Sequence, residues 1–291
     1  MKILTLVASD QPLQPDLLQQ VRALVDCIRV EWLAPQKAVE MHLAGEKELD
    51  RAALAALLAP CRIDHFLQDG DAPRRKKLLI SDMDATLVAE ETLDELSASI
   101  GLKDKIAAIT ARSMAGELDF HEALRTRIDM LRGLPESAIG EHLQHLPWVV
   151  GARELVATMV ADGAATVLVS GGFTCFTGAV AEKLGMQYHH GNTLIIKDGV
   201  LTGEVHEPIL GREAKLEFLH QYQQQYGLQR GDILAIGDGA NDLEMLRAAG
   251  LGVGFHPKEF LRRQVENSIL YGDLTALLYA QGYRTEEIIS S

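Results

Sequence analysis

Alternating and helix-spaced hydrophobic positions divide the first 68 residues into short strands and helices. They predict strands over residues 2–8, 28–33, 38–43 and 62–67, and helices over residues 15–25 and 49–58. The predicted order is βαββαβ, the split βαβ arrangement of a small α+β, ferredoxin-like domain. The polar stretch that follows, residues 69–77, contains glycine, proline and basic residues without periodicity, which predicts a solvated linker. We therefore expect a first domain with its linker over residues 1–73.

From residue 78 onward, short apolar runs alternate with longer helical patterns. Strands are predicted over residues 78–81, 166–169, 233–236 and 250–254, a hairpin across residues 197–199, and helices over residues 152–161, 174–184, 212–226, 241–248 and 274–279. Such alternation is typical of a mostly parallel sheet with helices on both faces. This predicts a second, α/β domain over residues 74–291.

A long helical stretch, about residues 92–146, interrupts this alternation directly after the first strand of the second domain. It would leave the sheet from a loop at the edge where ligands bind. An all-helical insertion at that edge predicts a cap over the active site, with bounds of about 90–148.

Composition and charge narrow the function classes. The chain has 291 residues, 47% of them hydrophobic, so it can bury a large core. Its 28 basic and 41 acidic residues give a net charge of −13, which predicts no nucleic acid and no anionic membrane surface as a partner. The three cysteines lack metal-site spacing, and no apolar run reaches membrane-spanning or signal-peptide length, so we expect a cytoplasmic protein.

Two acidic strings follow predicted buried strands. Asp82 and Asp84 follow the first strand of the second domain, and Asp238 and Asp242 follow a later one. Ligands of α/β folds bind at the carboxyl ends of strands, so the two strings predict one shared Mg²⁺ site. Asp82 and Asp84 suit a nucleophile and a general acid beside that metal, although the same pair also occurs in simple turns or caps.

Two further elements could hold an anion near these carboxylates. Ser170 and Gly171 end a predicted strand just before a helix, where a hydroxyl and backbone N–H groups can bind phosphoryl oxygens. Lys215 lies near the start of its helix, where a bound phosphate would offset the unfavourable helix dipole. The alternatives are an N-cap at Ser170 and an exposed helical lysine.

These residues together resemble a known family. Residues 82–86, Ser170-Gly171, Lys215 and residues 237–242, in this order and on these elements, resemble the four motifs of haloacid dehalogenase superfamily phosphatases. The resemblance covers residues 78 to about 285 and is strongest to the phosphoserine phosphatase family, which has a helical C1-type cap after the first motif. It implies a Rossmann-like core and Mg²⁺-dependent hydrolysis of O-phospho-L-serine through an aspartyl-phosphate, the last step of L-serine biosynthesis.

The resemblance also implies roles for individual residues. Asp82 would be the nucleophile, and Asp84 the general acid and then the general base. The metal, one Mg²⁺ per chain, would be bound by the Asp82 carboxylate, the Asp84 backbone carbonyl and Asp238. Asp242 would support these ligands without binding the metal itself. The groups that contact the phosphate end of the substrate would be Ser170, Gly171, Lys215 and Asn241. Ala85 departs from the family pattern, which has serine there; its backbone N–H would remain available.

The helical insertion contains residues similar to the substrate-recognition segment of that family. Phe120 and Arg127 lie seven residues apart and share one helix face. A guanidinium in an apolar stripe needs a partner, and a substrate carboxylate would be one. The alternatives for Arg127 are a side chain reaching solvent, or an ion pair with Asp129 or Glu122.

Glu91 and Met114 complete the predicted substrate site. Glu91 would bind the ammonium group of the same amino acid, in preference to Glu90, because of its spacing from Asp82. Met114 and Phe120 would exclude water from the site.

Two other interpretations stay open at this level. A phosphatase or phosphotransferase for another small phosphomonoester, such as phosphothreonine or homoserine phosphate, would share every catalytic residue. A catalytically inactive amino-acid sensor is the alternative from a different class. The first domain resembles ACT-type modules, which bind amino acids and regulate amino-acid enzymes; its other interpretation is a domain that only helps chains associate, as in a homodimer.

Overall fold

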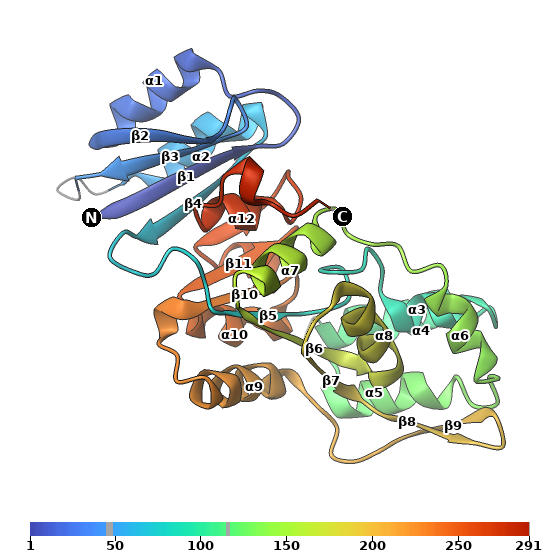
Figure 1. Ribbon diagram of the computed structural model, residues 1–291. Coiled ribbons are helices and arrows are strands. Elements are labelled where there is room, and N and C mark those ends of the chain that lie inside the picture. Colours follow the sequence, from blue (N-terminus) through green and yellow to red (C-terminus); the bar gives the residue numbers. More distant parts are fainter. Residues whose placement is uncertain (45–48, 115–116, 291) are drawn as a thin grey trace.

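A single continuous sheet contains strands from both the first and the last part of the sequence. The computed structural model describes residues 1–44, 49–114 and 117–290, and ten strands of this part form the sheet (Figure 1). In spatial order they are β2 (Cys27–Ala34), β3 (Ala38–Leu43), β1 (Lys2–Ala8), β4 (Ile63–Asp69), β12 (Asn267–Ile269), β11 (Leu251–Phe255), β10 (Ile233–Gly237), β5 (Leu78–Ser81), β6 (Ala165–Phe173) and β7 (Tyr188–Asn192).

The first four strands of this order are antiparallel and form the N-terminal module, residues 1–69. Helices α1 (Pro15–Leu24) and α2 (Arg51–Leu58) pack against each other and bury their apolar faces in one cluster with these strands. Helix α1 begins with a proline, which favours the first helical turn. Helix α2 is capped by the Asp50 side chain, which accepts the Ala53 N–H at 2.9 Å. The predicted βαββαβ order is therefore confirmed, with bounds shifted by at most two residues.

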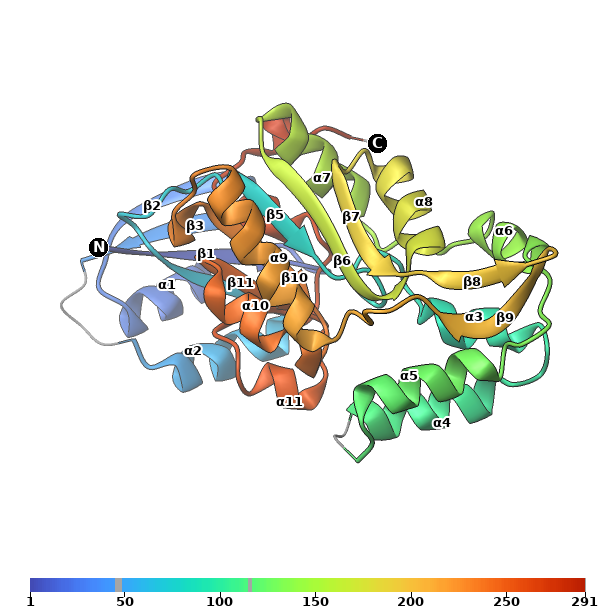
Figure 2. The same ribbon diagram turned by 90° about the horizontal axis from the view of Figure 1, so that it is seen from below.

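The other six strands, in the spatial order β12-β11-β10-β5-β6-β7, are parallel to one another and form the α/β core. Alternate residues of each strand face opposite sides. Leu79 of β5 packs in a cluster with α7 (Ala152–Ala161) and α8 (Thr174–Leu184), whereas Leu78 and Ile80 pack with α9 (Arg212–Gln225) and α10 (Leu243–Ala248). Figure 2 shows the two helix layers on either side of the sheet. The predicted parallel α/β sheet is confirmed.

A helical segment, residues 92–143, interrupts the core between β5 and β6. It contains α3 (Thr92–Ala98), α4 (Lys103–Met114), α5 (Phe120–Asp129) and α6 (Ser137–Leu143). The chain enters and leaves it through two stretches that pair with each other, since Ala89 N–H donates to Pro147 O at 2.8 Å and Val149 N–H donates to Leu87 O at 3.1 Å. The hairpin of β8 (Leu194–Lys197) and β9 (Val200–Val205) packs against α5 (Figure 2).

The N-terminal module joins the core through more than the sheet. Asp64 of β4 is 2% exposed, and its carboxylate accepts the backbone N–H groups of Leu270 at 2.7 Å, Tyr271 at 3.2 Å and Gly272 at 2.7 Å. The loop after β12 is thereby fixed to the module. A buried carboxylate with three N–H donors is well compensated for its lost hydration.

The prediction of a solvated linker is wrong for Arg74 and Lys76, whose side chains are docked, whereas Lys77 is exposed. Lys76 is 4% exposed and donates to the carbonyls of Pro73 at 2.5 Å and Gly231 at 2.9 Å. Arg74 pairs with the buried Glu40 of the module. The charge run therefore connects the module and the core instead of forming a hinge.

Short elements were the ones that the periodicity missed. Strand β12 and helix α11 (Glu259–Arg262) are too short to show a repeat. The predicted helix over residues 241–248 begins as a 3-10 turn over Ala240–Asp242 before α10, and the last helix, α12, covers Ala276–Ala280. Within the described ranges, no helix combines the length and the apolar character needed to cross a membrane.

Candidate active site

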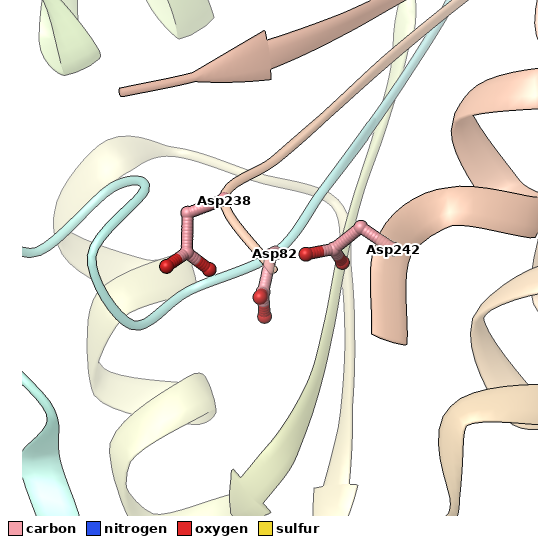
Figure 3. A group of neighbouring side chains, drawn as sticks. All are labelled: Asp82, Asp238 and Asp242. Carbon is pink, nitrogen blue, oxygen red and sulfur yellow. The ribbon is translucent and has the colours of Figure 1, made fainter. Parts of the chain in front are cut away.

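Three carboxylates meet at the carboxyl edge of the parallel sheet. Asp82 directly follows β5, Asp238 directly follows the neighbouring strand β10, and Asp242 ends the 3-10 turn after it (Figure 3). Each offers an oxygen within 4.8 Å of the others, and their exposed fractions are 5%, 6% and 0%. The two acidic strings of the sequence therefore form one cluster, as predicted.

Lys215 neutralises part of this charge. Its Nζ lies 2.8 Å from Asp82 Oδ2 and 2.6 Å from Asp242 Oδ1, and its side chain is 2% exposed. Burial alone would lower the pKa of Lys215, but the charges of Asp242 and Asp82 raise it above its ordinary value. The interpretation of Lys215 as an exposed helical lysine is wrong.

The arrangement fits a hard divalent cation. Burial and the charge of Asp82 raise the pKa of Asp238, although the ammonium of Lys258 works in the opposite direction. Within the described residues, the three carboxylates contact only two ammonium groups, those of Lys215 and Lys258, and a cation would neutralise the remaining negative charge. Asp242 uses one oxygen for Lys215 and the other for the Gly239 N–H at 3.0 Å. Asp82 and Asp238 are thus the better-placed ligands, and carboxylate oxygens suit Mg²⁺.

Asp84 is placed to carry a proton. Its Oδ1 accepts the Thr92 N–H at 3.1 Å, at the start of α3. Burial and then the negative charges of Glu91 and Asp82 raise the pKa of Asp84 well above its usual range. A carboxyl with a raised pKa keeps its proton to higher pH than usual, which suits a general acid. The next residue, Ala85, has φ 51° and donates its N–H to Glu90 O at 3.1 Å, so that N–H is already engaged.

The Ser170 segment differs from its predicted shape. Strand β6 continues through Gly171 and Gly172 to Phe173, with an irregular register against β7, so the glycines lie in extended backbone and not in a turn. Ser170 Oγ accepts the Gly172 N–H at 2.9 Å, and α8 has no side-chain cap, so the N-cap alternative is wrong. The Ser170 hydroxyl keeps its own proton for a ligand.

A cavity of about 510 Å³ connects these groups to the helical segment. One end is lined by Asp82, Asp84, Ser170, Gly171, Asp238 and Asn241, and the other by Glu91, Asp94, Thr110, Phe120, Leu124 and Arg127. The structure therefore brings most residues predicted for the phosphate end and for the amino-acid end to one cavity, while Lys215 lies behind the lining, in contact with Asp82. The side chain of Met114 lies outside the described residues.

Arg127 is held inside the helical segment. It is 9% exposed, and it donates through Nη1 to Thr110 Oγ1 at 3.0 Å and through Nε to Ala123 O at 3.3 Å. Burial lowers the pKa of Arg127, whereas the negative charges of Asp94 and Glu91 raise it and so partly offset the effect of burial. The alternative ion pair with Asp129 is wrong, because Asp129 pairs with Arg132 at 2.7 Å, and so is a side chain reaching solvent.

Lys258 is a site residue that the sequence analysis missed. Its side-chain Nζ lies 3.0 Å from Asp238 Oδ2 and 3.2 Å from Glu91 Oε1. Its backbone N–H donates to the backbone carbonyl of Asp238 at 2.9 Å. It therefore joins the metal-site carboxylates to the helical segment. Its place just after β11, at the same sheet edge as Asp82 and Asp238, was the signal that could have indicated it.

The sequence pattern of the haloacid dehalogenase-like hydrolase family matches residues 79–247. That range includes every motif described above, and we conclude that the chain belongs to the haloacid dehalogenase-like hydrolases.

Curated relatives narrow this class to the phosphoserine phosphatases. The Methanocaldococcus jannaschii phosphoserine phosphatase is 36% identical over 205 residues, which are 70% of this chain and 97% of that protein. The Streptomyces coelicolor phosphoserine phosphatase is 38% identical over 256 residues, 87% of this chain. This chain covers 62% of the length of the Streptomyces protein. A Mycobacterium tuberculosis phosphoserine phosphatase is likewise 38% identical to this chain, which covers 58% of its length.

Solved structures show the same fold. A HAD family hydrolase from Salmonella enterica serovar Typhi superposes with a TM-score of 0.85 at 28% identity, covering 96% of this chain and 97% of its own. A substrate-bound phosphoserine phosphatase complex has a TM-score of 0.66 at 36% identity and covers 70% of this chain and 97% of its own. The match to the Salmonella structure includes both the N-terminal module and the core.

Proposed function

We propose that this protein hydrolyses O-phospho-L-serine to L-serine and phosphate. The observation that carries the proposal is one cavity lined by Asp82 and Ser170 at the sheet edge and by Arg127 and Glu91 of the helical side, with Lys215 2.8 Å from Asp82. The first set suits a phosphoryl group, and the second suits the carboxylate and ammonium of an amino acid. The names of the relatives agree with this substrate.

In the first step, a carboxylate oxygen of Asp82 attacks phosphorus in line with the bond to the serine oxygen. That bond breaks, and Asp84 gives its proton to the departing oxygen, so that L-serine leaves and an aspartyl-phosphate remains on Asp82. The raised pKa of Asp84 supports this role, because the carboxyl must be protonated before the step.

In the second step, Asp84, now a carboxylate, takes a proton from a water molecule. The resulting hydroxide attacks phosphorus, the bond to Asp82 breaks, and phosphate is released. Both proton transfers use one carboxyl, so each turnover returns Asp84 to its protonated state.

The transferring phosphoryl oxygens are held by three donors. These are the Ser170 hydroxyl, the Gly171 N–H and the Lys215 ammonium, where negative charge spreads in the transition state. One Mg²⁺, held by the Asp82 carboxylate, the Asp84 backbone carbonyl and Asp238, would neutralise phosphate charge when bound. Asn241 contacts the phosphate end, and Asp242 fixes Lys215 behind the metal ligands.

At the amino-acid end, Arg127 binds the substrate carboxylate and Glu91 the ammonium. Glu90 is less suited to that role because its Oε1 lies 2.6 Å from His142 Nε2, away from the cavity lining. Phe120 lines the cavity and excludes water from the reacting atoms. The helical segment opens to admit the substrate and closes for the reaction.

We propose the following division of the chain. Residues 1–73 form an ACT-like module with its linker, and residues 74–291 form the phosphatase core with a C1-type helical cap over about residues 90–148. The strand order β2-β3-β1-β4 supports the ferredoxin-like assignment. The module either binds a regulatory amino acid or helps two chains form a homodimer. We expect the protein in the cytoplasm, which is consistent with a biosynthetic enzyme of this family.

The test is phosphate release from O-phospho-L-serine with Mg²⁺, repeated with EDTA and with added L-serine. Phosphothreonine, homoserine phosphate and p-nitrophenyl phosphate complete the panel. We expect the highest kcat/KM on phosphoserine and no turnover with EDTA. A higher kcat/KM on another phosphomonoester would reassign the substrate, and no release from any of them would indicate an amino-acid sensor.

A further inference from the structure

Three buried polar side chains, one from each of three helices, form a chain of hydrogen bonds beside the cavity. Asp94 is on α3, Thr110 on α4 and Arg127 on α5, and their exposed fractions are 8%, 7% and 9%. Arg127 Nη1 donates to Thr110 Oγ1 at 3.0 Å, and the single proton of the Thr110 hydroxyl is shared between two acceptors, Asp94 Oδ1 at 3.2 Å and Ile106 O at 3.1 Å. A hydroxyl can accept from one neighbour and donate to another, so Thr110 connects the cation to the carboxylate.

The remaining contacts of Arg127 fix the direction of its guanidinium. Nε donates to Ala123 O on the same helix, at 3.3 Å. Within the described part of the chain, Nη2 makes no hydrogen bond to the protein. The guanidinium is therefore tied on two sides and lines the cavity with a donor still available for a ligand. A planar group held in this way is preorganised to bind a carboxylate.

Asp94 supplies the nearby opposite charge. Burial lowers the pKa of Arg127, and Asp94 is the first group that acts against this effect. Because Asp94 reaches the arginine through Thr110, it does not occupy the donors that a substrate carboxylate needs. A direct Asp94–Arg127 ion pair would compete with that carboxylate for the guanidinium.

We propose that Thr110 and Asp94 are positioning residues that fix Arg127 for the α-carboxylate and so make the enzyme selective for phosphorylated amino acids. The proposal rests on the proposed function, in which Arg127 binds that carboxylate. Neither residue takes part in bond breaking. Their loss should weaken the binding of substrates that have a carboxylate and leave the chemistry at Asp82 intact.

The main variant is Thr110→Val, which keeps the shape of the side chain and removes the hydroxyl. We expect KM for phosphoserine to rise roughly 10- to 100-fold, the value of a hydrogen bond to a charged group, with kcat within about threefold of wild type. KM for p-nitrophenyl phosphate and for O-phosphoethanolamine, which have no carboxylate, should not change. Thr110→Ser should restore KM for phosphoserine.

A matched control is Thr126→Val. Thr126 lies on the same helix as Arg127, but its hydroxyl donates to Glu122 O at 2.8 Å and is exposed. This variant should leave KM unchanged for every substrate. Asp94→Asn provides a second variant of the hydrogen-bond chain, with the same shape and no charge, and should also raise KM for phosphoserine selectively. Circular dichroism and thermal melting of all variants separate misfolding from mispositioning.

A double-mutant cycle decides between positioning and general packing. In an Arg127→Ala background, Thr110→Val should have no further effect on KM, because the group that it positions is gone. An undiminished effect in that background, or an equal KM change for phosphoserine and phosphoethanolamine in the single variant, would overturn the proposal. A wild-type enzyme without activity on phosphoserine but with activity on p-nitrophenyl phosphate would overturn the proposed function instead.

Discussion

The ammonium of Lys215 lies 2.8 Å from Asp82 Oδ2, in a position where both side chains are buried. A lone carboxylate at that depth would be driven toward its protonated form, which is a poor nucleophile. The same ammonium also contacts Asp242 at 2.6 Å, so one cation serves both acidic strings. The ion pair therefore fixes the position of the Asp82 carboxylate, which lines the cavity.

We expect Asp82→Asn to abolish phosphate release while the protein stays folded. The amide has nearly the same shape and can still accept from Lys215, but it cannot attack phosphorus. The loss in kcat should be at least about a thousandfold, as for other nucleophile replacements. Phosphate release and thermal melting are the measurements, with Asp129→Asn, which is exposed and pairs with Arg132, as the control. Near wild-type turnover in the Asp82 variant would remove the nucleophile assignment.

Asp84 should set an alkaline limb in the pH profile. Its pKa is raised, so the acid form is present below that pKa and is lost as pH rises through it. The rate of cleavage of phosphoserine should then fall with increasing pH. In Asp84→Asn, p-nitrophenyl phosphate, whose leaving group needs no proton, should give a burst of about one product per chain and then stop, since no base remains for the second step.

Rapid-mixing measurement of p-nitrophenol release tests this. Steady turnover without a burst in the Asp84 variant would show that another group acts as the base. An unchanged alkaline limb for phosphoserine in that variant would show that another group acts as the acid.

Arg127→Ala should distinguish substrates by their carboxylate. The loss of a buried, charge-assisted contact corresponds to a rise in KM for phosphoserine of roughly 30-fold or more, with p-nitrophenyl phosphate affected far less. Arg127→Lys should be intermediate, because an ammonium cannot bind a carboxylate through two parallel hydrogen bonds. Steady-state kinetics on both substrates measures this, and equal losses on both would remove Arg127 from substrate recognition.

Asp64→Ala should lower stability and leave the reaction unchanged. The variant leaves the N–H groups of Leu270, Tyr271 and Gly272 without their carboxylate acceptor. We expect a loss of about 2–4 kcal/mol and a fall in Tm of roughly 5–15 °C, with kcat near wild type at low temperature. Asp10→Ala, which removes an exposed pair with Arg62, is the control and should shift Tm by little. Equal shifts in both variants would contradict the role given to Asp64.

The sequence predicted what local patterns can encode. The helices over residues 152–161 and 174–184 have the predicted bounds, because each has a clear apolar period between turn residues. Asp82 and Asp238 were found because each directly follows a buried strand, and the register of β5 with β10 brings those strand ends together. The parallel sheet made that convergence predictable.

Contacts between distant segments could not be predicted in this way. Periodicity placed Arg127 on an apolar helix face, but which face of α4 it meets depends on how the helices pack, so Thr110 was not found. Lys258 is in a short loop without a motif. The basic linker residues looked solvated because their acceptors, such as Glu40 and Gly231 O, lie far away in sequence.

The contacts of Asp64 also set an order of events during synthesis. Its partner Leu270 lies 206 residues later in the sequence, and the Ala280 carbonyl, which accepts from Gln68, lies 212 residues after that glutamine. At about 5–20 residues per second, the ribosome needs roughly 10–40 s to supply these partners. The N-terminal module is therefore made with its docking edge exposed to water, and strand β12 covers that edge only after residue 269 has been synthesised.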